Sequence, residues 1–209
     1  MLPKPSLLVA VDTIVLAVHE WDLKVLLVQR NDTPQDTRVL PWGFVREEET
    51  LLETAKRKLK EETGYADFTV HNVGTFDAIN RDERARVLSI WFLALTYKID
   101  FPFEDGKNTK NAQFISLCHL PKLGFDHKKM IHSTLEYLQE KIMYSDIAKP
   151  LFGKQFTLTE LQTAYELILG KQLNIRNFRK RIVDIWLVVP TGEVEIGVGH
   201  RPAQYFRFA

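Results

Sequence analysis

GFVREEETLLETAKRKLKEETGY, residues 43–65, is the most strongly patterned stretch of this 209-residue chain. Gly64 stands where a glycine in the left-handed conformation commonly ends a helix. We therefore expect one amphipathic helix from Glu47 to Thr63. The apolar side chains that recur at helical spacing are Leu51, Leu52, Ala55 and Leu59.

The same stretch resembles the Nudix box, whose pattern is G-x5-E-x7-R-E-U-x-E-E-x-G-U with U apolar. In that family the box forms a loop, a helix and a loop that hold divalent cations against a diphosphate. The resemblance implies an α+β fold in which residues 1–148 form an α/β/α sandwich around a mixed sheet. The matching anchors are Gly43, Glu49, Arg57, Leu59, Glu61, Glu62, Gly64 and Tyr65.

One anchor departs from the pattern, because Lys58 stands where the family has a metal-binding glutamate. Positions 58, 61 and 62 share one helix face, where carboxylates would surround a hard cation such as Mg²⁺. A lysine instead places an ammonium in that position and removes one ligand. We therefore expect no bound metal at this site, where Glu61 and Glu62 are the remnants of the metal-binding set. We also expect no required cofactor and no strong hydrolase activity. The alternative is a silent surface change at Lys58.

The cleft that the resemblance implies could still bind a nucleotide after catalytic activity has been lost. Arg30 ends a predicted strand, and NRDERAR (80–86) resembles a segment of the ADP-ribose branch of the family. Guanidinium groups match phosphate oxygens and stack on purines. The simpler interpretation of RDER is a solvated charge run, and that of Asp126 is a helix cap. The predicted effector-binding residues are Arg30, Trp42, Gly43, Phe44, Lys58, Glu62, Arg81, Asp82 and Arg84.

Apolar, β-branched runs surround the box. Residues 7–18 and 23–29 predict two strands joined by the turn HEWD, which makes a hairpin. Residues 67–79 and 85–99 predict two further strands. A helical period follows at 126–144.

The pattern of residues changes after Pro150 and Gly153, which interrupt the helical pattern. Thr157 and Glu160 form a capping box for a helix that stops at Gly170, and Asn174 caps a second helix. Short strands follow in WLVV, EVEI and QYFRF, with a turn at Pro190-Thr191-Gly192. Two helices and a small hairpin are the layout of a winged helix-turn-helix, which we assign to residues 149–209.

The second of these helices is basic. We expect Ile175, Phe178, Ile182 and Ile185 to face inward and the charged residues to face outward. In the major groove, arginine forms hydrogen bonds with guanine and asparagine with adenine. The simpler interpretation of a basic cluster on a helix is a solvated surface that binds no partner. Its place in a helix-turn-helix favours DNA. The predicted DNA-binding residues are Arg176, Asn177, Arg179 and Lys180, with His200, Arg201 and Gln204 near the wing.

Together the two halves resemble the NrtR family, Nudix-related transcriptional regulators of NAD metabolism. The resemblance includes the altered box, residues 156–182 and the closing GHRPAQYFRF (199–208). It implies a bacterial repressor that acts as a homodimer on a palindromic double-stranded DNA operator, with ADP-ribose or a related nucleotide as effector. Nucleotide binding then favours a dimer geometry whose recognition helices no longer match two successive major grooves.

Two other hypotheses stay open: an active Mg²⁺-dependent Nudix hydrolase of ADP-ribose, and a nucleotide-binding module that docks a protein partner. Composition narrows the broad class. The chain is 45% hydrophobic and 26% charged, which excludes a disordered class, and it has no uncharged apolar run of about 18 residues. The single Cys118 excludes an internal disulfide framework. We therefore expect a cytoplasmic protein without a membrane partner.

Overall fold

A long hairpin forms the centre of the larger sheet. The computed structural model describes residues 7–197, 199 and 201–209. In it β1 (Leu8–His19) and β2 (Asp22–Arg30) pair antiparallel, as predicted. Their turn residues Glu20 and Trp21 have φ values of 50° and 59°, the left-handed conformation that suits the twist of a two-residue hairpin.

The larger sheet is mixed, as expected. Its strand order is β5-β6-β1-β2-β7, with β4 paired to the first half of β1. The β1–β6 pair is parallel, and the other pairs of this sheet are antiparallel. A separate parallel pair joins β3 and β8. The further bounds are β3 Thr37–Arg38, β4 Trp42–Phe44, β5 Val70–Phe76, β6 Val87–Thr96, β7 Thr109–Ser116, the 3₁₀ helix η1 Leu117–His119, and β8 Lys122–Leu123.

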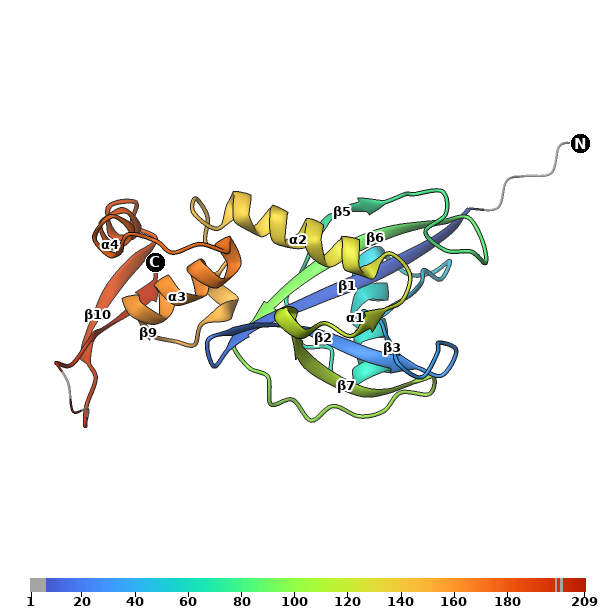
Figure 1. Cartoon of the computed structure of the whole chain (residues 1–209), viewed down its shortest axis with the longest axis horizontal. Coiled ribbons are helices and arrows are strands. Elements are labelled where there is room, and N and C mark those ends of the chain that lie inside the picture. The colour runs from blue at the N-terminus through green and yellow to red at the C-terminus, as the bar shows by residue number, and fades with distance from the viewer. Residues whose placement is uncertain (1–6, 198, 200) are drawn as a thin grey trace, which may run out of the picture.

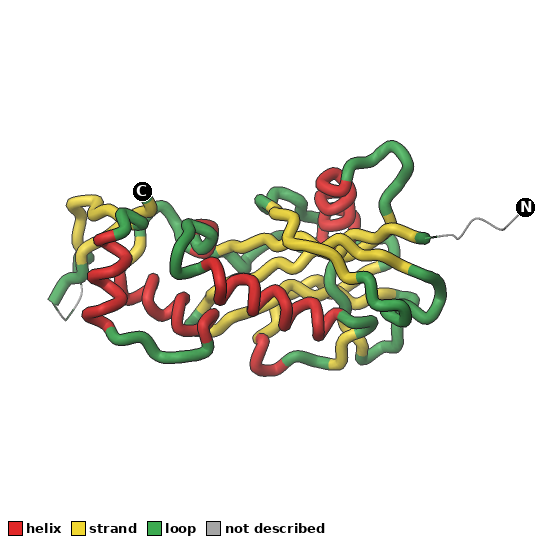
Figure 2. Tube along the Cα trace, turned by 90° about the horizontal axis from the view of Figure 1, so that it is seen from above, coloured by secondary structure: helices red, strands yellow, loops and turns green. Residues whose placement is uncertain are grey.

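Helices cover both faces of this sheet (Figure 2). Successive side chains of a strand point to opposite faces, so β1 contributes to two cores. Val15 packs in the same cluster as Leu59 of α1 (Leu51–Thr63). Ile14 packs with Met130 of α2 (His127–Lys141) on the other side. This layering confirms the α/β/α sandwich.

The first helix is shorter than predicted. It begins at Leu51 rather than Glu47, because Thr50 and Glu53 form a capping box that fixes the start. Its end is as expected, since Gly64 adopts φ 74° and donates its N–H to the carbonyl of Lys60.

The C-terminal region forms a winged helix-turn-helix (Figure 1, left). The predicted capping box of Thr157 and Glu160 begins its first helix, Gly170 ends it in the left-handed conformation, and Asn174 caps the second. A three-stranded sheet with the order β10-β11-β9 completes the unit. The bounds are η2 Lys149–Leu151, β9 Phe156–Thr157, α3 Leu158–Leu169, α4 Ile175–Asp184, β10 Val188–Val194 and β11 Gln204–Phe208.

Two local predictions for this region are wrong. Pro190-Thr191-Gly192 is not a turn but an irregular part of β10, where Gly192 has φ 88° and the register shifts against β11. The side chain of Thr191 donates to the carbonyl of Tyr205 and so keeps this part on the sheet. Ile175 and Ile185 do not face inward: they are 57% and 46% exposed, because they lie at the two ends of α4.

The two units share one apolar core. Leu138 of α2 belongs to the same cluster of buried side chains as Leu161 and Tyr165 of α3. Gln139 of α2 also donates to the carbonyl of Ile168 at 2.9 Å. The winged helix is therefore packed against the far end of α2. No helix in the described part of the chain is both long and apolar enough to cross a membrane.

Candidate functional site

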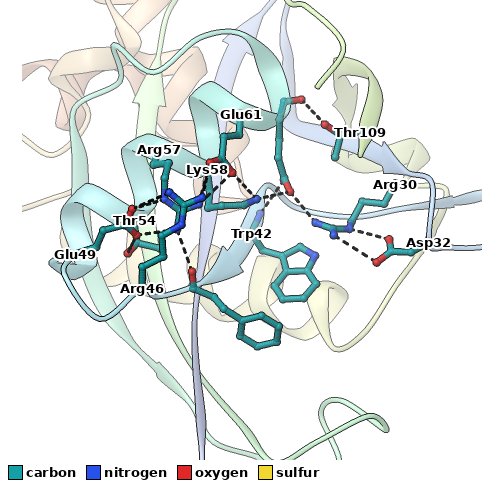
Figure 3. A network of polar contacts seen from close by, with 12 residues as sticks. Arg30, Asp32, Trp42, Arg46, Glu49, Thr54, Arg57, Lys58, Glu61 and Thr109 are labelled. Carbon is teal, nitrogen blue, oxygen red and sulfur yellow. Dashed lines mark hydrogen bonds and ion pairs between the residues drawn. The ribbon is translucent and has the colours of Figure 1, made fainter. Parts of the chain in front are cut away.

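Glu62, near the end of α1, is a carboxylate with only 3% of its side chain exposed. Its Oε1 accepts a hydrogen bond from Nη1 of Arg30 at 2.7 Å, and Oε2 accepts one from the backbone N–H of Trp42 at 3.1 Å. Its backbone carbonyl accepts one from Thr109 at 3.1 Å. One residue thus joins α1 to β2, β4 and β7 (Figure 3).

Lys58 lies one turn earlier on the same helix. Its Nζ is 3.0 Å from Oε2 of Glu61 and 3.4 Å from Oε1 of Glu62. Its stem crosses Gly43, where a β carbon would overlap Cδ and Cε of the lysine. Figure 3 shows the ammonium of Lys58 beside the carboxylate of Glu61. The glycine of the box thus leaves room for the lysine of the helix.

The chain's own cations also satisfy the outer carboxylates. Nε of Arg57 lies 2.5 Å from Oε1 of Glu49, and Nη1 lies 3.1 Å from Oε2 of Glu61. Its Nη2 donates to the carbonyl of Phe44 at 3.0 Å. Burial raises the pKa of Glu62 above its ordinary value, although Lys58 and Arg30 both oppose that shift.

This arrangement does not fit a divalent cation. Mg²⁺ prefers oxygen ligands in octahedral geometry, whereas here an ammonium already contacts both remnant carboxylates. Among the residues that the structure describes, no three His, Cys, Asp or Glu side chains are placed to hold a metal ion. A second positive charge beside Lys58 would be repelled.

Trp42 lies beside this network and is 5% exposed. The guanidinium carbons of Arg30 and Arg84 stand 4.9 and 5.5 Å from the centre of its ring. Phe44 and Phe125 contact it edge-on, with ring centres 5.4 and 5.3 Å away. The indole therefore lies between two aromatic rings and two arginine side chains.

A cleft of about 980 Å³ opens next to Trp42, large enough for a nucleotide. Three segments line it: 32–37, 75–84 and the start of α2 at 124–129. Phe125 lies in this wall with φ 54°, a conformation that costs a non-glycine residue roughly 1–2 kcal/mol. Of the nine predicted effector residues, Arg81, Asp82 and Arg84 line the cleft, and the other six lie in the adjoining network of Glu62 and Trp42.

Arg81 is tied into a buried ion cluster. Its Nη2 lies 2.8 Å from Asp126 and 3.3 Å from Asp12, and its side chain is 5% exposed. Asp126 stands at the N-cap position of α2, as predicted, but its side chain makes no capping hydrogen bond: its carboxylate binds Arg81 instead. Arg81 therefore anchors the first turn of α2 to β1.

His127 completes this cluster. The backbone N–H of Leu40 donates to its Nδ1 at 3.0 Å, which leaves the ring proton on Nε2, 3.0 Å from Oδ1 of Asp12. Ser89 donates to the other oxygen of Asp12. Our prediction did not include Asp12, His127 or Ser89. The signal for Asp12 was present in the sequence, because it interrupts an otherwise apolar strand.

Arg84 and Asp82 form an ion pair at the mouth of the cleft, with Nη2 2.8 Å from Oδ2. The side chain of Arg84 is 52% exposed, whereas that of Asp82 is 5% exposed. Arg84 is thus a cationic group that the cleft presents to solvent, and Asp82 orients it.

The predicted DNA-binding residues of α4 divide into two kinds. Arg176, Asn177 and Lys180 are exposed, while Phe178 is buried beneath them. Arg179 is half-buried, and its Nη2 donates to Oγ1 of Thr159 at 3.1 Å. Its guanidinium therefore also braces α4 against α3, a contact that the sequence did not predict.

The wing follows the end of β10. Arg201 is exposed in the segment before β11, and Gln204 is the exposed first residue of β11. His200 lies outside the described residues. Both predicted wing residues that the structure describes are thus at the surface.

A sandwich with an altered carboxylate helix, followed by a winged helix, defines a two-domain chain of the Nudix class. Residues 8–134 match the NUDIX domain, and residues 149–208 match the NrtR DNA-binding winged helix domain. The chain is 34% identical to the "ADPR responsive transcriptional repressor NtrR" of Acinetobacter baylyi, over 98% of this chain and 83% of that protein. It therefore belongs to the NrtR family.

Three further comparisons bear on the site. The crystal structure of Shewanella oneidensis NrtR complexed with a 27mer DNA has a TM-score of 0.79 at 30% identity, covering 96% of this chain and 93% of that one. The NUDIX domain of the same protein, complexed with ADP ribose, has a TM-score of 0.58 at 29% identity and covers 64% of this chain and 89% of that one. The ADP-ribose pyrophosphatase of Methanocaldococcus jannaschii is 38% identical over 130 residues, 62% of this chain and 73% of that enzyme.

Replacing Asp12 by asparagine tests the buried ion cluster. Burial raises the pKa of Asp12, but His127, Arg81 and Ser89 outweigh it and hold the pKa below its ordinary value of 3.8. Such a carboxyl stabilises the fold above its unfolded pKa and loses that effect as the pH falls through its folded pKa. Asp12→Asn should therefore lower the free energy of unfolding by about 3 kcal/mol at pH 7, as measured by urea denaturation.

The difference between Asp12→Asn and wild type should narrow as the pH falls below about 4, because the carboxyl of the unfolded chain is protonated there while the folded carboxyl, with its lowered pKa, is still ionised. Asp100→Asn, at an exposed aspartate, is the control and should change little. Equal stability of Asp12→Asn and wild type at pH 7 would contradict the assigned role of the cluster.

Proposed function

We propose that this protein is a transcriptional repressor of NAD-metabolism genes whose DNA binding is controlled by ADP-ribose or a related nucleotide in the Nudix cleft. The observation that carries the proposal is the 34% identity to an ADPR-responsive repressor across 98% of the chain, which includes both the cleft and the winged helix. We place the domain boundary between residues 148 and 149, and the protein in the cytoplasm, where its DNA would be.

The chemistry of the cleft suits a nucleoside diphosphate. Arg84 presents a half-exposed guanidinium at the cleft wall, and Arg30 stands nearby over the same indole ring. Guanidinium donors pair with phosphate oxygens, and Phe125, which is 37% exposed, offers an aromatic surface for a base. Arg81 contributes indirectly, by holding the wall in place.

We infer that the cleft binds its effector without a metal and without appreciable turnover. Lys58 supplies, as a fixed ammonium, the positive charge that a bound cation would bring to Glu61 and Glu62. An ammonium cannot lower the pKa of a bound water as a metal ion does, so the site can hold a diphosphate without activating water against it.

Lys58→Glu should restore the carboxylate helix of the family. We expect it to release AMP from ADP-ribose in a Mg²⁺-dependent reaction at least about tenfold faster than wild type, because a third carboxylate completes the ligand set. AMP release with and without EDTA measures this. Lys56→Glu, an exposed lysine of the same helix, makes the same charge change and should gain nothing.

The second candidate function is an active hydrolase of ADP-ribose, and the 38% identity to an ADP-ribose pyrophosphatase favours it. The same assay separates the two. Substantial release of AMP by the wild type that needs Mg²⁺ and disappears in Glu62→Gln would support the hydrolase. It would count against a repressor whose cleft binds ADP-ribose without hydrolysing it.

The DNA-binding surface that we propose is the exposed face of α4 together with the wing. Arg176, Asn177 and Lys180 lie on this face, and Arg201 and Gln204 lie on the wing side. We propose a homodimer on a palindromic operator, because a winged helix reads one major groove and two copies read a symmetric site.

Replacing Arg176 and Lys180 by alanine tests this surface without disturbing Arg179, which braces α3. The double variant should weaken operator binding at least about tenfold and flatten the slope of log K against log salt by about two, since two phosphate contacts disappear. Fluorescence anisotropy at several salt concentrations measures both. Lys107→Ala/Lys110→Ala removes two exposed lysines from the Nudix domain and should keep the wild-type slope.

ADP-ribose affinity, measured by calorimetry, should stay unchanged in Arg176→Ala/Lys180→Ala. Loss of nucleotide binding with intact DNA binding would show that the two roles have been assigned to the wrong domains.

A further inference from the structure

Asp32 links the two arginines that stand over Trp42. Its Oδ1 lies 2.9 Å from Nε of Arg30, and its Oδ2 lies 3.4 Å from Nη2 of the same residue and 3.8 Å from Nη1 of Arg84. Asp32 sits in the loop after β2, lines the cleft and is 49% exposed. An accessible carboxylate therefore bridges the guanidinium groups proposed to bind the effector.

The edge of Arg30 that Asp32 occupies is the one suited to a phosphate. Nε and Nη2 form the parallel pair of donors that grips a carboxylate or a phosphate with two hydrogen bonds. Glu62 binds Nη1 instead, from within the protein. The side chain of Arg30 is only 12% exposed, so an anion arriving from the cleft meets Asp32 before it reaches this edge.

We propose that Asp32 is an internal competitor of the effector: its carboxylate occupies the phosphate-binding edge of Arg30 and must move aside when a diphosphate binds. This inference rests on the proposed function, that the cleft takes ADP-ribose or a related nucleotide. Asp32 then sets the affinity of the cleft, and with it the effector concentration at which DNA binding changes.

The charges of the region agree with this role. Arg30 holds the pKa of Asp32 below its ordinary value through its hydrogen bond, and Arg84 adds to the shift, against a smaller opposing effect of burial. The carboxylate is therefore ionised at neutral pH and repels an incoming phosphate as well as blocking its partner. The side chain of Asp32 is 49% exposed, so its carboxylate can move into solvent when an anion takes its place.

Asp32→Asn tests the inference, with Asp36→Asn as the matched control. Both remove one negative charge from the same exposed loop, but the described structure shows no ion pair for Asp36. Isothermal titration with ADP-ribose and, separately, with inorganic pyrophosphate should show Asp32→Asn binding each ligand about 3- to 30-fold more tightly than wild type. Asp36→Asn should bind like wild type, and thermal melting checks that all variants are folded.

A double-mutant cycle adds a second readout. Arg84→Ala should weaken binding, and the gain from Asp32→Asn should be smaller in its presence, because one of the two arginines released by Asp32 is then missing. Equal gains in the two backgrounds would contradict a bridge between Arg30 and Arg84.

The other outcomes separate this inference from the proposed function. If wild type binds ADP-ribose and Asp32→Asn binds both ligands no better, the inference fails and the proposed function stands. Equal tightening by Asp32→Asn and Asp36→Asn also overturns it, since net charge alone would then explain the gain. If Asp32→Asn tightens pyrophosphate while no variant binds ADP-ribose, the competitor role stands and the nucleotide effector falls.

Discussion

The buried carboxylate of Glu62 is the group around which the cleft is built. A carboxylate that is 3% exposed must be paired, because an unpaired charge in that position costs several kcal/mol. Its partners come from three directions: Lys58 on its own helix, Arg30 on β2 and the backbone of Trp42 on β4. The contacts of one side chain therefore fix the helix, the strand that carries Arg30 and the ring on which both arginines stand.

This dependence explains why Lys58 changes the site as a whole. In the family pattern a glutamate at this position would add a third carboxylate, and the resulting negative charge would need a bound cation. The lysine supplies the compensating charge from the chain itself. In our account the cleft is thus assembled without a metal, and its remaining chemistry is recognition of an anion.

The second ion cluster connects the cleft to the winged helix. Asp12, Arg81 and Asp126 fix the first turn of α2, which forms part of the cleft wall. The other end of that helix packs on α3, with Gln139 bonded to the carbonyl of Ile168. A ligand that shifts the first turn of α2 would therefore also act on α3, the helix that packs beneath α4. A continuous helix such as α2 is the kind of element that can couple two sites.

The sequence predicted the elements that local chemistry determines. The hairpin of β1 and β2, the capping box of Thr157 and the glycine that ends α1 are all present in the structure. Local patterns did not predict contacts between distant segments. Arg81 was predicted to bind the effector, or else to belong to a solvated charge run, but its guanidinium instead pairs with Asp12 and Asp126, which are 69 and 45 residues away.

Similar limits apply at the winged helix. Arg179 belongs to a basic run on α4, and only the approach of Thr159 from α3 turns it into a brace. Pro190-Thr191-Gly192 has the composition of a turn, but pairing with β11 keeps it within a strand. Tertiary contacts decided both cases, and a single sequence does not contain them.

The measurement that tests the central claim most directly is the anisotropy of labelled duplexes from upstream of the protein's own gene and of nearby NAD genes, compared with scrambled duplex. Each is titrated with the protein at one moderate salt concentration, with and without ADP-ribose. Our account predicts specific binding that ADP-ribose weakens by roughly 5- to 150-fold, the range of a typical coupling free energy. Binding no tighter than to scrambled DNA, or specific binding that ADP-ribose leaves unchanged, would contradict it.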